Sequence, residues 1–274
     1  EEVGALALHP STSVLAVGDD AGDVHLFDLA AAKALPPLIE AHTNICSSVA
    51  FSPSREWELS TAGMDCVCAQ WDYRRAIRCS EWCVWEGGMQ GGGQVLNPRH
   101  VHCLSYSPDG HHLALALGDG SLELREVGKG EVVASATPHR AAVSQAHFAP
   151  ELGRGGGGAV PIITAGDDAQ LQLWTAEALL PPPDFGGSKR QRGCGGAVGS
   201  VSEPSALTSE ENDVSEGLCL RQHAAVGLPL KPNWIAAASA GSAGVGVHSQ
   251  EGIVCVASNS PAIDVFRVQG STLS

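Results

Sequence analysis

The sequence predicts an all-β fold, a β-propeller whose blades are small antiparallel sheets packed side by side. Short runs of alternating apolar and polar residues are joined by turns rich in Gly and Asp, which is typical of antiparallel strands. The same unit recurs at intervals of 43, 55 and 42 residues, measured between Pro10, Pro53, Pro108 and Pro150, a period that favours propeller blades. A β-sandwich also has many short strands, but it would not repeat the turn and a following aromatic residue at a constant offset.

Each unit is expected to hold strands in a fixed order. The first strand is an alternating run that ends in Pro, expected at 5–10, 48–53, 104–108 and 146–150. A second short apolar strand leads into a turn that begins at Gly18, Gly63, Gly118 and Gly166. The third strand follows at 24–28, 67–72, 122–126 and 171–175, and a weaker fifth copy covers 252–268.

The units divide the chain into three parts. Residues 1–180 carry four units (1–40, 41–80, 100–137 and 138–180), with a long loop near 81–99. Residues 181–222 open with three prolines and continue with Gly, Ser and Glu. Because that composition buries little apolar surface, we expect a disordered insertion there. Residues 223–274 are expected to form the last blade.

Composition excludes several kinds of partner and location. The net charge is −14, from 16 basic and 30 acidic residues, which argues against direct binding to nucleic acid or to an anionic membrane. Nine cysteines are too few for a disulfide scaffold, and an odd number favours reduced thiols inside the cell. We therefore expect an intracellular location, cytoplasmic, nuclear or both.

Two units share a set of four residues, which we call a tetrad. The tetrads are His42, Thr61, Asp65 and Trp71, and His139, Thr164, Asp168 and Trp174. In both, Thr lies four residues before Asp and Trp six residues after it. The pattern resembles the WD40-repeat family. The resemblance implies that the His, Thr, Asp and Trp side chains form a buried hydrogen-bonded chain with a structural, non-catalytic role.

The other units depart from this pattern. Phe27 stands at the Trp position of the first unit, Val17 at its Thr position, and Arg125 at the Trp position of the third. We expect these blades to stack by apolar packing alone. Residues 42–51, 95–98 and 233–234 resemble one branch of the family, whose members are expected to have seven blades. The sequence shows about five and begins without Met, so about two N-terminal blades are expected to be missing.

One motif points to a partner. Residues Trp71, Asp72, Tyr73 and Arg74 resemble the Trp-Asp-x-Arg box of WD40 proteins that dock on the damaged-DNA-binding adaptor of cullin 4 ubiquitin ligases. The resemblance implies a substrate-receptor role in such a ligase, with the Arg74 guanidinium pairing with carboxylates of the adaptor. The competing interpretation is that Trp-Asp merely ends a strand and that Arg74 follows by chance.

Two other binding roles stay open, a general scaffold for complex assembly and a reader of methyl-lysine or histone peptides. A reader needs an aromatic cage, and Trp57, Trp82, Trp85 and Trp234 are not committed to the strand pattern.

Enzymatic and zinc-binding roles are less favoured. Cys66 and Cys68, Cys79 and Cys83, and His100 and His102 form short-spaced pairs, but their spacing fits no strong zinc signature. We find no recurrent carboxylate or metal cluster. The sequence therefore predicts a protein-binding function, with no catalytic residue, no metal, no cofactor and no small-molecule substrate.

Overall fold

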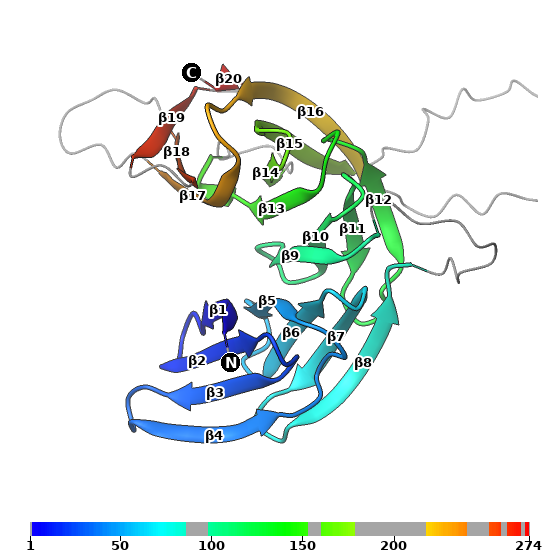
Figure 1. Cartoon of the computed structure of the whole chain (residues 1–274), viewed down its shortest axis with the longest axis vertical. Helices are drawn as coiled ribbons and strands as arrows, with labels where there is room; N and C mark the ends of the chain where they lie inside the picture. The colour runs from blue at the N-terminus through cyan, green and yellow to red at the C-terminus, as the bar shows by residue number, and fades with distance from the viewer. Residues whose placement is uncertain are drawn as a thin grey trace, which may run out of the picture.

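The computed structural model describes residues 2–85, 98–152, 160–178, 218–239, 252–258, 262–269 and 272–273. These residues form five four-stranded antiparallel sheets. The sheets follow one another along an open arc, with the first strand of each on the concave side (Figure 1). The predicted fold class is confirmed, because the described residues form five blades in a β-propeller arrangement.

The blades, numbered in chain order, have the following strands. Blade 1 holds β1 (Val3–Leu8), β2 (Val14–Asp19), β3 (Val24–Asp28) and β4 (Lys33–Leu38). Blade 2 holds β5 (Cys46–Phe51), β6 (Glu58–Gly63), β7 (Val67–Asp72) and β8 (Ile77–Cys83). Blade 3 holds β9 (Val101–Tyr106), β10 (His112–Leu117), β11 (Leu122–Glu126) and β12 (Val132–Ala136). Blade 4 holds β13 (Val143–Phe148), β14 (Val160–Gly166), β15 (Gln170–Ala178) and β16 (Leu218–Gly227), with a short 3₁₀ helix, η1 (Pro150–Leu152). Blade 5 holds β17 (Pro232–Ser239), β18 (Gly252–Ser258), β19 (Ile263–Gln269) and β20 (Thr272–Leu273).

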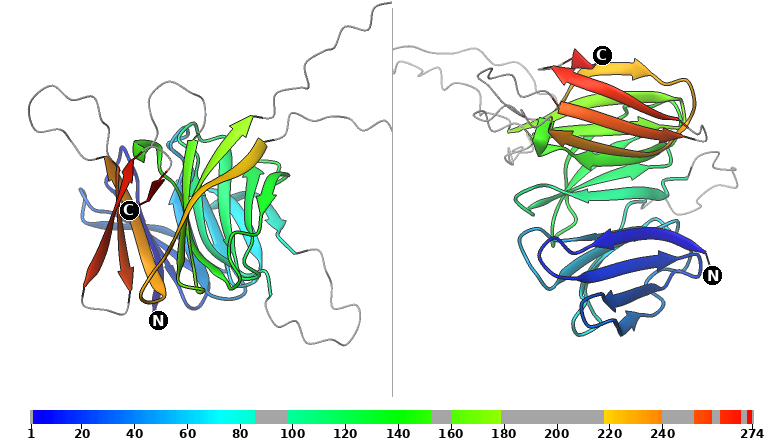
Figure 2. Two further views of the ribbon diagram at one scale, coloured as in Figure 1. Left: turned by 90° about the horizontal axis from the view of Figure 1, so that it is seen from above. Right: turned by 90° about the vertical axis from the view of Figure 1, so that its left-hand side faces the viewer.

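The hydrophobic core lies between blades. Four buried clusters each join residues of two neighbouring sheets, and the sheets stand as separate layers when the arc is viewed from the side (Figure 2). The second strand is the most enclosed; all six residues of β6 are buried. Because a single blade cannot bury both of its faces, this lateral stacking supplies most of the apolar burial.

Serine hydroxyls connect the first strands of neighbouring blades. The Ser48 hydroxyl accepts from the Leu104 backbone N–H at 3.0 Å, and the Ser105 hydroxyl accepts from the Phe148 N–H at 3.2 Å. The Ser144 hydroxyl donates to the Pro232 carbonyl at 3.4 Å. Because such contacts recur, they fix the position of each first strand along the first strand of the next blade.

The structure differs from the sequence-based division at blade 4. Strand β16 pairs with β15 in the fourth sheet, so residues 181–217 fall between the third and fourth strands of one blade. The fifth blade begins at Pro232. The predicted disorder of 181–222 concerns mostly residues outside the described ranges, as does the loop predicted near 81–99, of which 86–97 are not described. Within the described residues, no helix is long and apolar enough to cross a lipid bilayer.

Candidate functional site

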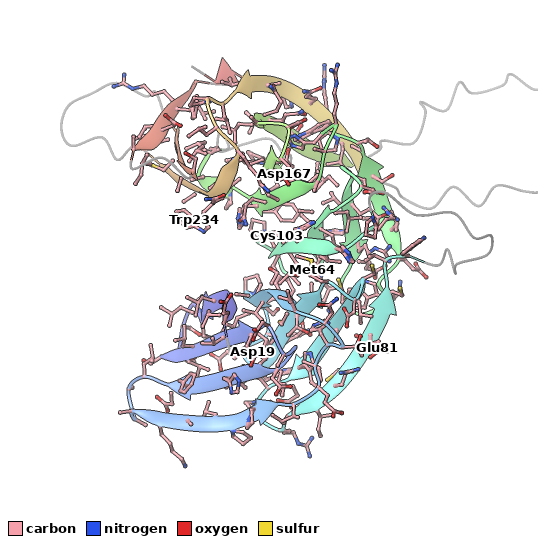
Figure 3. All side chains as sticks on the ribbon, viewed as in Figure 1. Asp19, Met64, Glu81, Cys103, Asp167 and Trp234 are labelled. Atoms are coloured by element: carbon pink, nitrogen blue, oxygen red, sulfur yellow. The ribbon has the colours of Figure 1, made fainter. Side chains whose placement is uncertain are left out.

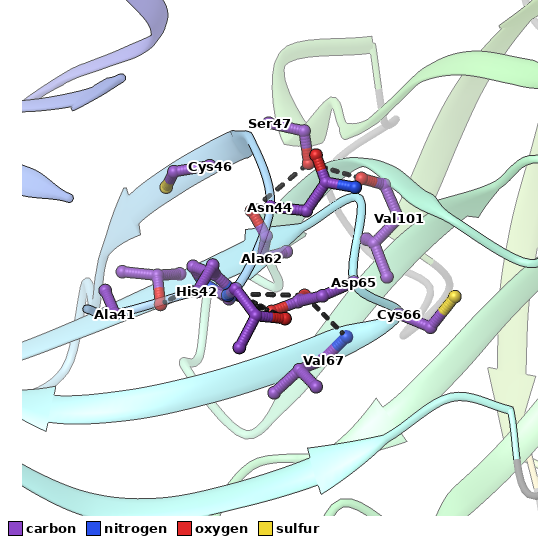
Figure 4. A network of polar contacts seen from close by, with 12 residues as sticks. Ala41, His42, Asn44, Cys46, Ser47, Ala62, Asp65, Cys66, Val67 and Val101 are labelled. Atoms are coloured by element: carbon purple, nitrogen blue, oxygen red, sulfur yellow. Dashed lines mark hydrogen bonds and ion pairs between the residues drawn. The ribbon is translucent and has the colours of Figure 1, made fainter. Parts of the chain in front are cut away.

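The structure brings the four tetrad residues of blade 2 together. The Trp71 indole N–H donates to Thr61 Oγ1 at 3.0 Å, and Thr61 Oγ1 lies 2.9 Å from His42 Nε2. His42 Nδ1 lies 3.1 Å from Asp65 Oδ1 (Figure 4). A single order of donors satisfies every group: indole N–H to hydroxyl oxygen, hydroxyl O–H to Nε2, and Nδ1–H to carboxylate.

The tetrad of blade 4 repeats this geometry. The His139 Nδ1 to Asp168 Oδ1 and His139 Nε2 to Thr164 Oγ1 distances are both 2.9 Å, and the Trp174 indole donates to Thr164 at 3.3 Å. Neither tetrad imidazole has any exposed side-chain surface. Since no substrate can reach the histidines, the His–Asp pairs have a structural role.

The charge states follow from these contacts. Burial lowers the pKa of His139 even though the adjacent Asp168 opposes the effect, so the imidazole is neutral. For Asp65, burial alone would raise the carboxyl pKa, but His42 and the backbone N–H groups of Thr43 and Val67 outweigh it and the pKa is lowered. The Asp168 pKa is lowered in the same way. The blade 4 tetrad is thus a neutral imidazole hydrogen-bonded to a carboxylate.

A glycine of the preceding blade holds each tetrad histidine in place. The His42 N–H donates to the Gly22 carbonyl at 2.9 Å, and the His139 N–H donates to the Gly120 carbonyl at 3.3 Å. Both glycines have positive φ (90° and 89°), and a Cβ on either would overlap the histidine carbonyl. Only glycine fits both the conformation and the close approach.

Blade 3 replaces the tetrad with charged residues. Arg99 Nε donates to Asp119 at 2.7 Å, and its guanidinium also pairs with Glu123. Glu123 in turn accepts from Arg125 Nε at 2.8 Å. Arg125 donates to the Gly130 carbonyl at 2.8 Å. The expectation that this blade stacks by apolar packing alone is therefore wrong, because an Asp–Arg–Glu–Arg chain links the positions where His and Trp stand elsewhere.

Blade 1 has a shorter polar contact. His25 Nε2 lies 2.9 Å from Asp19 Oδ2, and Phe27, at the Trp position, is part-exposed. The expectation of purely apolar stacking is incomplete here as well.

The end of β7 places Arg74 at the surface. The Tyr73 ring is buried and packs edge-on against Phe51, with ring centroids 5.2 Å apart, while the Tyr73 N–H donates to the Trp57 carbonyl at 3.2 Å. The next side chain, Arg74, is 58% exposed and its Nε lies 3.3 Å from Asp72 Oδ1. A buried tyrosine thus anchors the turn from which the guanidinium projects.

Comparison with known proteins agrees with this geometry. The family described as "WD domain, G-beta repeat" matches residues 36–72, the segment that carries the complete tetrad of blade 2. Residues 36–72 are thus similar to a WD40 repeat. The family "Anaphase-promoting complex subunit 4 WD40 domain" matches residues 64–151, from the turn of blade 2 to the start of η1.

A curated relative supports the same branch of the family. The chain is 24% identical over 163 residues to the WD repeat-containing protein 53 homolog of Dictyostelium discoideum. The match covers 54% of this chain and 44% of that protein, so the chain aligns with less than half of the relative's length. The predicted resemblance to WD repeat-containing protein 53 is confirmed.

The four candidate cage tryptophans lie on or beside different strands. Trp57 precedes β6, Trp82 lies on β8 against Gly130, Trp85 follows β8, and Trp234 lies on β17. Within the described part of the chain, the aromatic ring pairs join only His9, Phe51 and Tyr73. Among the described residues, no ring pair joins two of these tryptophans.

The short-spaced Cys and His pairs do not assemble a metal centre. Cys66 Sγ lies 3.7 Å from His100 Nδ1, but no group of three or more His, Cys, Asp or Glu among the described residues is arranged to hold a metal ion.

The concave side of the arc holds a cavity of about 340 Å³. Its walls come from the first strands of all five blades, and they include Ser47, His102, Cys103, His147 and Trp234. The cavity has no signature in the sequence, because its walls come from residues far apart in the chain.

Proposed function

We propose that this WD40 chain is a protein-interaction scaffold that docks, through Arg74, on the damaged-DNA-binding adaptor of cullin 4 ubiquitin ligases. The observation that carries the proposal is the exposed guanidinium at the end of β7. Only Nε contacts Asp72, and within the described residues the two terminal nitrogens have no hydrogen-bond partner. Those nitrogens can therefore pair with a carboxylate of a partner.

The surroundings of Arg74 support a partner with acidic groups. Arg75 is exposed beside it, and Arg55 lies 5.9 Å from the Trp57 ring near the same turn. Three arginines thus lie around one corner of a chain with a net charge of −14, where Arg55 pairs with Glu58 and Arg74 with Asp72. Complementary charge increases the association rate and makes binding sensitive to salt.

The test compares two neighbouring arginines. In co-precipitation of the full chain with the purified adaptor, Arg74→Ala should abolish binding, while Arg75→Ala, the matched control, should retain it. Arg74→Lys keeps the charge but loses the planar fork, so binding should be intermediate. Unchanged binding of Arg74→Ala, with the circular dichroism spectrum preserved, would exclude adaptor docking and leave the scaffold role.

The proposal includes no enzymatic step and places the protein inside the cell, in the cytoplasm or the nucleus. WD40 propellers are in general non-enzymatic scaffolds. The seven cysteines whose side chains the structure describes are all unpaired, which is consistent with a reducing compartment.

A further inference from the structure

Blade 1 contributes a buried histidine to the turn at 72–76 that carries Arg74, called the Arg74 turn below. Side chains of blades 1 and 2 fill the space between the two sheets (Figure 3), and Phe51 and Tyr73 belong to this cluster. His9 directly follows β1 and is only 3% exposed. Its imidazole packs edge-on against both aromatic rings, with centroids 4.9 Å from Phe51 and 6.2 Å from Tyr73. Because Tyr73 directly precedes Arg74, a residue of blade 1 contacts the Arg74 turn of blade 2.

Both imidazole nitrogens of His9 have backbone partners. Nε2 lies 3.0 Å from the Glu56 carbonyl oxygen, and because a carbonyl oxygen only accepts, Nε2 carries the proton. Nδ1 accepts from the backbone N–H groups of Ser11 and Thr12, both at 3.1 Å. The imidazole therefore joins two loops: Nδ1 closes the loop of blade 1, and Nε2–H holds the loop of blade 2.

The contacts continue from this loop of blade 2 to the Arg74 turn. Glu56 is followed by Trp57, whose carbonyl accepts from the Tyr73 N–H at 3.2 Å. The Tyr73 side chain also interacts with the side chain of Thr12, so blade 1 contacts this tyrosine at two points. Since Tyr73 is buried and Arg74 is the next residue, the place of the tyrosine determines where the exposed guanidinium begins.

The corresponding loops of blades 2 and 3 have no comparable side chain. His9, Ser52 and Ser107 each precede a proline, and each N–H donates to the carbonyl of the first residue of the second strand, at 2.8, 3.0 and 2.8 Å. The Ser52 hydroxyl accepts from the Arg55 N–H, and the Ser107 hydroxyl accepts from the His112 N–H. These two serines thus bond within their own loops, whereas His9 reaches across to the following blade.

We propose that His9 is a positioning residue for Arg74: its imidazole, from the neighbouring blade, fixes the turn that presents the guanidinium to an acidic partner. This inference rests on the proposed docking function. It extends the docking site from one blade to two, because the order of the Arg74 turn depends on the loop that follows β1. Loss of the Nε2 hydrogen bond and of the ring contacts should loosen the turn and weaken docking, although Arg74 itself is unchanged.

Two substitutions separate the two hydrogen-bonding roles of His9. His9→Asn keeps a short acceptor for the N–H groups of the blade 1 loop but removes the ring and the Nε2 donor. His9→Gln has a longer amide that can still donate to the Glu56 carbonyl, while the acceptor at Nδ1 is lost. If the imidazole only closes its own loop, His9→Asn is the milder change. If it positions Arg74, His9→Gln is the milder change.

Amide hydrogen exchange of the full chain, followed by mass spectrometry, tests the Arg74 turn without any partner. The backbone N–H groups of Tyr73 and Arg75 donate to carbonyls within blade 2, so peptides covering 72–76 report on the turn. We expect exchange there to be about 10-fold faster in His9→Asn and less affected in His9→Gln. The corresponding turn at 126–130 of blade 3 is the internal control and should not change.

The decisive quantity is the ratio of the exchange rates in these two turns. An unchanged ratio in His9→Asn overturns the proposal, and so does a general loss of stability that raises both rates equally. A larger change in His9→Gln than in His9→Asn also overturns it.

The second measurement is the affinity of the full chain for the purified adaptor. His9→Asn should bind about 10-fold more weakly, and His9→Gln should bind better than His9→Asn. The control is His139→Gln, which removes a buried, hydrogen-bonded imidazole from blade 4 and should leave the affinity within about twofold. Unchanged affinity of His9→Asn, or an equal loss in His139→Gln, overturns the proposal.

Arg74→Ala distinguishes failure of this inference from failure of the proposed function. Unchanged binding of Arg74→Ala overturns the docking function and the inference together. Loss of binding in Arg74→Ala with unchanged binding in His9→Asn overturns the positioning role of His9 alone.

Discussion

At the scale of single residues, the hydroxyl of Thr164 connects the indole and the imidazole of the blade 4 tetrad. It accepts from the Trp174 indole and lies 2.9 Å from His139 Nε2, so it uses both its acceptor and its donor. Thr164, His139 and Trp174 are buried, so water cannot readily replace a missing partner of the hydroxyl. A single hydroxyl therefore satisfies two buried nitrogens.

Thr164→Val should lower the free energy of unfolding by about 1–3 kcal/mol, because the shape is kept while two buried nitrogens lose their partner. Thr164→Ser keeps the hydroxyl and should cost less. Urea unfolding followed by tryptophan fluorescence measures both. Equal stability of Thr164→Val and the unmodified chain would show that the tetrad hydrogen bonds contribute little.

The neutral imidazole of His139 makes stability depend on pH. Its pKa is lowered in the folded chain, so below about pH 6.5 the unfolded chain binds a proton that the folded chain does not. Stability is therefore fully present above pH 6.5 and is lost as the pH falls, by up to about 1.4 kcal/mol per pH unit for each such histidine. His102, whose pKa is also lowered, adds to the same trend.

The measurement is urea unfolding at pH 7.5, 6.5 and 5.5. His139→Gln should be less stable at pH 7.5 but should lose less on acidification, whereas His111→Gln, in an exposed turn, should keep the full slope. An unaltered slope in His139→Gln would contradict the assignment of a neutral imidazole.

At the scale of elements, the charged chain of blade 3 performs the role that a tetrad performs in its neighbours. Glu123 is nearly buried on β11 between two guanidinium groups. Removing the carboxylate leaves Arg99 and Arg125 as neighbouring like charges. Removing one member of a buried ion-pair chain lowers the free energy of unfolding strongly, because a charge is left without its partner. This holds even where replacing the whole chain by apolar residues would change stability little.

Glu123→Gln should therefore lower the free energy of unfolding by about 2–3 kcal/mol, somewhat below the cost at a fully buried pair because Arg99 is part-exposed. The matched control is Glu126→Gln on the same strand, whose partner Lys129 is exposed. It should change stability by less than about 0.5 kcal/mol. Equal effects of the two substitutions in urea unfolding would show that Glu123 contributes no more to the free energy of unfolding than an exposed glutamate does.

Local pattern predicted the strands whose partners are close in the chain. The third strands expected at 67–72 and 122–126 are β7 and β11, because alternation and the adjacent turn specify a hairpin. Strand β16 could not be assigned in the same way, since residues 179–217 separate it from β15. The Arg99–Glu123–Arg125 chain departs from the His and Trp letters of the motif, and Cys103 and His147 lie 44 residues apart on different blades. Contacts between blades join residues far apart in the chain, so no short sequence pattern predicts them.

At the scale of the whole molecule, the arc leaves apolar surface open on its first blade. Leu6 and Leu8 of β1 are 63% and 61% exposed, and Val3 is similarly exposed. On blade 5, Ile263 and Val265 are exposed as well. In the interior of the arc, equivalent surfaces are covered by the next blade. Clusters of exposed apolar side chains of this kind promote association.

The isolated chain should therefore associate reversibly with rising concentration, and Leu6→Glu with Leu8→Glu should reduce that association at least about threefold, since the two charges oppose burial of the patch. Light scattering after size-exclusion chromatography across a concentration series measures it. Val132→Glu, an exposed apolar residue on the outer strand β12, is the control for added charge and should have little effect. Equal association of the two variants would mean that the contacts between copies lie elsewhere, whereas selective loss in the β1 variant would identify the open face of blade 1 as the surface responsible.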